Sequence, residues 1–188
     1  MAANTRETRA ELARLEGLRD SWNRTATESQ TRADAAYRLA LGQASVDGGD
    51  PEPLFDEAAR LRDESEQAHR CYVQLSGIEI PKVQLALEQA LILELEQQAD
   101  ALRIESADSR AAAVAAIQAT GQSEITLDFT GHESQRLHER ALALERRILA
   151  LRGDPAMPGG RNATGLIKLK QDVEHMRRVA EKELYGTD

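Results

Sequence analysis

The residues with the most chemical potential are a glutamate and a histidine three positions apart, Glu66 and His69. Residues at this spacing share one face of a helix, so the pair could supply two ligands of a metal site. A carboxylate-bridged site in a helical bundle needs two Glu-x-x-His pairs and two further glutamates, all directed inward. The nearest second pair, Gln135 and His138, lacks the carboxylate. We therefore expect no metal site and interpret Glu66 and His69 as solvated residues on the outside of a helix.

The other reactive group is the thiol of Cys71, the only cysteine in the chain. His69 is near in sequence, but two residues apart on a helix the side chains point to different faces, so the histidine cannot activate the thiol. One cysteine also excludes a disulfide framework and a zinc site of several thiolates. We interpret Cys71 as a small residue that fills space beside a packing seam.

Anion binding has one candidate loop, residues 159–166, which contains Arg161 and leads into an expected helix. Backbone N–H groups at a helix start attract phosphate groups. The loop lacks both the Gly-Lys-Ser/Thr ending and the preceding strand of a nucleotide-binding loop, so we expect no nucleotide cofactor.

Arginines are frequent in residues 130–152, namely Arg136, Arg140, Arg146, Arg147 and Arg152. Glutamates interleave with them, which favours ion pairs within one helix over a surface that faces DNA. Residues 46–120 carry fifteen acidic and six basic residues, which argues against nucleic acid along the chain's whole length. Contact with nucleic acid is expected at most through Arg146, Arg147 and Arg161.

Composition indicates which elements hold these residues. The chain has 188 residues, 41% of them apolar but only 3% aromatic. A core of Leu, Ala, Ile and Val suits helices packed on helices better than an aromatic-rich sandwich. There is no run of 18 apolar residues and no secretory signal behind Met1, so we expect no membrane partner and a location in the cytoplasm or within a virion or similar particle.

The first two predicted helices form a hairpin. Asn4 and Glu7 have the spacing of a capping box, and apolar or small residues recur at steps of three and four from Leu15 to Ala40. Residues 45–51 break this helix and Pro51 starts the next. The second helix alternates steps of four and three through Leu54, Ala58, Leu61, Ser65, Ala68, Tyr72 and Leu75. This heptad pattern predicts an antiparallel coiled coil.

A third helix is predicted to begin at Pro81, after a break over residues 76–81. Its first part, residues 85–95, is apolar on more than one side, as expected for a helix surrounded by neighbours or entering a subunit interface. Beyond Leu102 the apolar stripe thins, so we expect the densest core in the middle of the protein.

Residues 124–129 alternate polar and apolar side chains and predict the only strand in the sequence. A lone strand must pair with a second strand that the pattern does not reveal, or with another chain. A fourth helix is predicted from Thr130, and a last one carries apolar residues from Leu166 to Leu184 until Gly186 ends it.

Residues 115–153 combine a helix end, the turn Thr120-Gly121-Gln122, a short strand, a cap at Thr130 and a Leu-rich helix. This order resembles the small head-to-tail joining proteins of tailed bacteriophages. The resemblance implies a virion connector that acts by ring assembly and has no catalytic residues.

The sequence as a whole therefore predicts an all-α, elongated helical bundle with one short strand, divided into residues 1–119 and 120–188. We expect no catalytic, cofactor or metal site, and a structural protein that associates with itself and with other structural proteins. The alternative is a coiled-coil adaptor that binds a partner helix, and an enzyme using Glu66 and His69 comes third. The expected interface residues are Trp22, Leu54, Leu61, Leu75, Leu87, Leu91, Ile125, Leu127 and Phe129.

Overall fold

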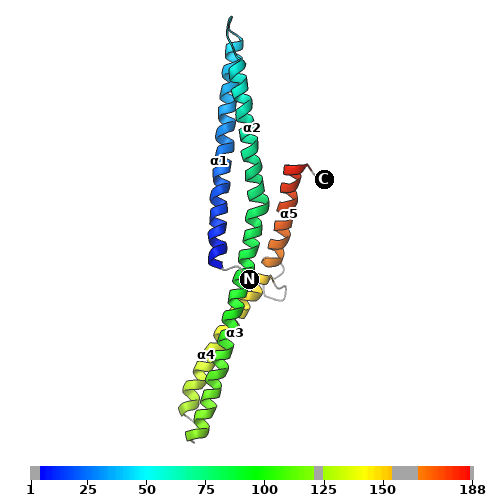
Figure 1. Cartoon of the computed structure of the whole chain (residues 1–188). Coiled ribbons are helices and arrows are strands. Elements are labelled where there is room, and N and C mark those ends of the chain that lie inside the picture. Colours follow the sequence, from blue (N-terminus) through cyan, green and yellow to red (C-terminus); the bar gives the residue numbers. More distant parts are fainter. Residues whose placement is uncertain (1–4, 121–124, 154–164, 187–188) are drawn as a thin grey trace. The chain divides into compact units, whose positions relative to one another are not determined.

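The structure, a computed structural model, describes residues 5–120, 125–153 and 165–186. These parts of the chain are helical and contain no strand, which confirms the predicted all-α class. The elements in chain order are α1 (Thr5–Ala44), α2 (Glu52–Gln74), a π-helix η1 (Leu75–Glu79), α3 (Ile80–Thr120), α4 (Ile125–Arg152) and α5 (Leu166–Tyr185), shown in Figure 1.

Contacts divide the chain into two compact units. The helical-hairpin unit comprises residues 6–84 and 172–188, and the α3–α4 unit comprises residues 1–5 and 85–171. These boundaries differ from the predicted division after residue 119. The division into two domains at that residue stays a prediction. Each unit is described below by itself.

In the helical-hairpin unit, α1 and α2 lie side by side and run in opposite directions (Figure 1). The Ser65 hydroxyl donates to the carbonyl of Ala26 at 2.8 Å, and the Tyr37 ring meets the Phe55 ring edge-on at 5.6 Å between centroids. Most residues of the predicted stripes are buried in this seam, whereas Leu18 and Trp22 of the predicted α1 stripe are exposed at 40% and 38%. The buried ones are Leu15, Ala26, Ser29, Ala33, Ala36, Ala40, Ala58, Leu61, Ser65 and Ala68. Most are small, so the two backbones can approach closely.

The predicted break at residues 76–81 is wrong. The backbone passes from α2 through η1 into α3 without a loop, and the Ile80 N–H donates to the carbonyl of Leu75, five residues back. Pro81 lacks an N–H, and its ring would meet a carbonyl of the preceding turn in a regular α-helix. A π-turn is wider by one residue, which gives the proline ring room while the helix continues.

Gly77 lies in η1, and α5 passes directly against it. A Cβ placed on Gly77 would be 2.4 Å from the Cβ of Ala180, which is far inside van der Waals contact. Ala180 itself is buried, and His69 and Glu183 form an ion pair at 3.0 Å between α2 and α5. The glycine that favours a break in the sequence is thus a contact point between helices.

The α3–α4 unit has its own core. Ile92 and Leu95 of α3 pack with Ile148 of α4, and the half-buried Leu144, Leu151 and Leu166 cover them. Farther along, the hydroxyl of Ser106 donates to the Ser134 carbonyl at 2.9 Å, and the Ser134 hydroxyl donates to the Ser106 carbonyl at 3.0 Å. These reciprocal bonds between buried side chains bring α3 and α4 close together.

The predicted strand at residues 124–129 is wrong, because Ile125–Phe129 form the first turns of α4. Residue 124 lies outside the described residues. The sequence offers no second strand that could pair with this segment, and an unpaired strand leaves its backbone groups unsatisfied. Within α4 the C=O groups of these residues accept hydrogen bonds from N–H groups one turn farther along the helix. Thr130 therefore lies inside α4 and does not begin it.

Helix α5 ends as predicted. Gly186 has a φ of +66°, a left-handed conformation that favours glycine, and its N–H donates to the carbonyl of Lys182 at 2.9 Å. Asn4, which the capping-box spacing places at the start of α1, lies outside the described residues.

Candidate interaction surfaces

Glu66 and His69 each form an ion pair at the surface of the helical-hairpin unit. Glu66 accepts from Arg70 at 3.1 Å within α2, and His69 lies 3.0 Å from Glu183 of α5. All four side chains are about half exposed or more. The His69 ring also stacks beside the Tyr72 ring, at 6.1 Å between centroids. Glu66 and His69 line an open hollow together with residues of α1 such as Asn23 and Gln30.

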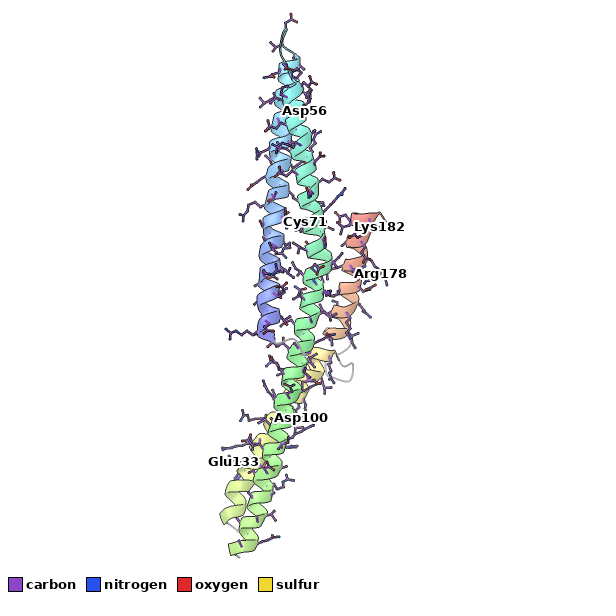
Figure 2. The ribbon with its side chains drawn as sticks, in the orientation of Figure 1. Asp56, Cys71, Asp100, Glu133, Arg178 and Lys182 are labelled. Carbon is purple, nitrogen blue, oxygen red and sulfur yellow. The ribbon has the colours of Figure 1, made fainter. Side chains whose placement is uncertain are left out.

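Cys71 lies on α2, where Figure 2 labels it, and its side chain is half-buried. No group of three or more His, Cys, Asp or Glu side chains is gathered for a metal ion in the parts of the chain that the structure describes. Residues 159–164 of the candidate anion loop, with Arg161, lie outside the described residues.

The predicted interface residues fall into different environments. Leu61 is 1% exposed and belongs to the core of the helical-hairpin unit, so it leaves no surface for a partner. Leu54, Leu75, Leu87 and Leu91 are half-buried, whereas Trp22 is exposed at 38%. The side chains of Ile125, Leu127 and Phe129 lie outside what the structure describes.

A surface that the heptad pattern did not reveal lies at the end of the α1–α2 hairpin. Leu39, Leu41 and Val46 are exposed, with 63%, 48% and 64% of their surfaces open to solvent. Leu39, Val46, Asp47 and Asp50 line one hollow there, together with Arg38, the residue before this stretch. Residues 39–59 contain five acidic residues, Asp47, Asp50, Glu52, Asp56 and Glu57, and no basic one. We call residues 39–57 the hairpin tip. Figure 2 labels Asp56 near this end of α2.

Helix α3 exposes a second apolar row. Leu93, Ile104 and Val114 are exposed, with Ile104 at 63%. At 3.6 residues per turn they lie on average about a quarter of a turn around α3 from its buried residues Ile92 and Ala99. Apolar side chains over a wide arc of one helix are typical of a helix with more neighbours than its own chain supplies.

The arginines of α4 are not neutralised in the way that their interleaved glutamates suggest. Glu139 accepts from Gln135, and Glu145 pairs with Arg103 of α3. Arg152 pairs with Glu96 of α3. Within the described residues, no ion pair is formed by Arg136, Arg140, Arg146 or Arg147, all of which are exposed. The predicted intrahelical pairs are therefore not made at these positions.

An apolar groove runs beside these arginines between α3 and α4. Ala101 and Leu102 line it from α3, and Ala143 and Leu144 line it from α4. Gln98 and Arg140 stand at its edge. We call this the α3–α4 groove. It offers a partner an apolar floor with a positively charged rim.

Ion pairs on the surface of α1 shift the pKa values of their members. Arg14 donates two hydrogen bonds to the Glu11 carboxylate, at 2.8 and 2.6 Å. These bonds lower the pKa of Glu11 and raise that of Arg14. Arg19 likewise has a raised pKa, chiefly because it bonds to Asp20. None of these groups lies in a cleft, so they stabilise α1 locally.

In comparisons with known proteins, no protein-family model, curated protein or solved structure matches this chain. Among the helices of the described residues, none combines the length and the apolar character needed to cross a membrane.

Proposed function

We propose that this protein is a non-enzymatic structural protein that associates with itself. The observation that carries the proposal is the set of large apolar side chains left exposed on both compact units, at the hairpin tip and along α3. Burial of apolar surface is the main driving force of association, and clustered exposed apolar residues mark interaction sites. We further propose that α1 and α2 pack as an antiparallel coiled coil, which would make the hairpin a stiff arm.

The most concrete form of this proposal is a component of a phage or phage-like particle near the head–tail junction. The resemblance to joining proteins included a predicted strand at residues 124–129, but Ile125–Phe129 are helical. The support for the connector proposal is therefore the exposed apolar surfaces. Such a component closes into a ring, which requires each copy to offer two different complementary surfaces. The two exposed apolar regions on separate units supply candidates for both.

Negative-stain electron microscopy of the purified chain tests the connector proposal. We expect closed oligomers of uniform size at high protein concentration. Genes for portal, capsid and tail proteins beside the coding gene would give independent support. Irregular aggregates or single copies at every concentration would contradict ring formation.

The alternative, a coiled-coil adaptor, has its own motivation in the half-buried Leu87 and Leu91 of α3. An adaptor would remain a single copy when pure and would take up one equivalent of a partner helix. Oligomers formed by the pure chain would argue against it.

A further inference from the structure

Three of the unpaired arginines lie in a row on α4. Arg136, Arg140 and Arg147 are separated by four and seven residues, close to one and two turns of a helix. The row therefore occupies one face and extends over about 16 Å. In the described residues these side chains have no acidic partner, and all three are exposed. We call them the arginine row.

The apolar floor of the α3–α4 groove lies directly beside this row, because Arg140 belongs to both. Protein interfaces combine a buried apolar centre with a polar or charged rim. A nucleic-acid backbone presents phosphates but no aliphatic side chains for Leu102 and Leu144 to cover. The groove and the row together favour an acidic protein surface with exposed aliphatic residues.

The hairpin tip has this chemistry. Leu39, Leu41 and Val46 supply exposed aliphatic groups, and the five carboxylates of the tip have no basic residue among them. The tip thus matches the α3–α4 groove in both respects, apolar against apolar and acidic against basic.

We propose that the hairpin tip of one copy docks in the α3–α4 groove and against the arginine row of a second copy, an inference that rests on the proposed self-association. The two surfaces differ, so the contact is heterologous. Each bound copy still presents a free tip or a free groove, and the contact repeats until a ring closes or a filament grows.

The charges give the contact a salt dependence. Exposed ion pairs are screened over about 10 Å at 0.1 M ionic strength. Complementary charge of this kind sets the association rate and the choice of partner more than the affinity. We therefore expect assembly to weaken as salt is raised, while the apolar contact retains part of the affinity.

Charge reversal in the full-length chain tests the contact. The groove variant carries Arg136→Glu, Arg140→Glu and Arg147→Glu. The tip variant carries Asp47→Lys, Asp56→Lys and Glu57→Lys, and it leaves Asp50 in place because that carboxylate accepts the Glu52 N–H at 3.3 Å. The matched control is Arg24→Glu, Arg32→Glu and Arg110→Glu, which reverses three exposed arginines away from both surfaces. Circular dichroism verifies that each variant is helical, and glutamine versions replace any variant that is not.

We expect each variant alone to need at least about tenfold more protein than the wild-type chain to assemble, as disruption of charge complementarity implies. The control should assemble like the wild type. Equal amounts of the groove and tip variants should recover assembly when mixed, because the reversed tip then faces the reversed groove.

Each of the following results would overturn the inference. Variants that assemble like the wild type, or a mixture that does not recover, would place the interface elsewhere and leave self-association intact. A groove variant that loses binding to a short DNA duplex while assembling normally would assign the arginine row to nucleic acid. A wild-type chain that never assembles would contradict the proposed self-association as well as this contact. Results with the variants alone can contradict only the contact.

Discussion

Gly77 lies where α5 packs against η1. Gly77 belongs to a segment rich in helix breakers, yet it lies in a continuous helical stretch where Ala180 leaves no room for a Cβ. The α-carbon hydrogen is what allows α5 to approach. At the residue scale, the close contacts of this protein depend on small side chains, with Ser65 and Ser106 as further examples.

Replacing Gly77 should therefore destabilise the protein. In a helix interior Gly→Ala ordinarily gains about 0.5–1 kcal/mol, and Gly17→Ala is the matched control because nothing lies within 4 Å of its added Cβ. At Gly77 the overlap with Ala180 should cost about 1–3 kcal/mol, which outweighs that gain. Urea unfolding of both variants measures the difference. Equal stabilisation by the two substitutions would show that α5 does not pack on η1.

Glu11 offers a prediction about pH. Its pKa is lowered in the folded chain because Arg14 donates hydrogen bonds to the carboxylate. A group with a lowered folded pKa adds stability above its unfolded pKa and loses that contribution as the pH falls through the folded value. NMR titration should give Glu11 a pKa below its ordinary value, and Arg14→Gln should raise it again. An unchanged pKa in that variant would contradict the pairing.

At the scale of elements, the sequence predicted the seam between α1 and α2 well. Ala26, Ala33, Ala58 and Leu61 recur at steps that only a helix places on one face, and all are buried. The pattern extends over many turns, so local exceptions do not disturb it. The class, the hairpin and the end of α5 at Gly186 follow from such long or specific signals.

Shorter signals failed at the same scale. The alternation from Ile125 to Phe129 spans too few residues to distinguish a strand from a helix, and no second strand was available to pair with it. Gly77 and Pro81 each disfavour a helix locally, but contact with α5 and the wider π-turn accommodate them. These are long-range effects that a local pattern does not contain.

The candidate surfaces were the hardest part to predict. Leu39 and Leu41 lie outside the apolar stripe of α1, and residues at such positions are ordinarily expected to face solvent. The interleaved glutamates suggested pairs for the α4 arginines, but Glu145 pairs across to α3 instead. Partner choice among charges depends on which helix lies opposite, and the spacing along one helix does not determine it.

The seam gives the element-scale prediction. Leu61→Ala should destabilise the chain by about 2–5 kcal/mol, because Leu61 is 1% exposed and its removal leaves a cavity between α1 and α2. Leu39→Ala, at an exposed position of the hairpin tip, should change stability by less than about 0.5 kcal/mol. Thermal and urea unfolding of the two variants provide the comparison. Similar losses in both would mean that the seam is not the main source of stability in this unit.

At the scale of the whole molecule, a chain of 188 residues with few aromatic side chains divides its apolar residues between narrow internal seams and exposed rows. The seams hold the helices of each unit together. The exposed rows, at the hairpin tip and on α3, have no role within their own unit. In the proposed self-association, the hairpin tip of one copy would be buried in the α3–α4 groove of another, and the arginine row would orient it there.

The most direct measurement of this account is the solution mass of the wild-type chain by multi-angle light scattering over a wide range of protein concentration. We predict a mass that exceeds the 20.7 kDa of one chain, rises with concentration and falls when salt is added. A mass of 20.7 kDa at every concentration and salt level would contradict the account.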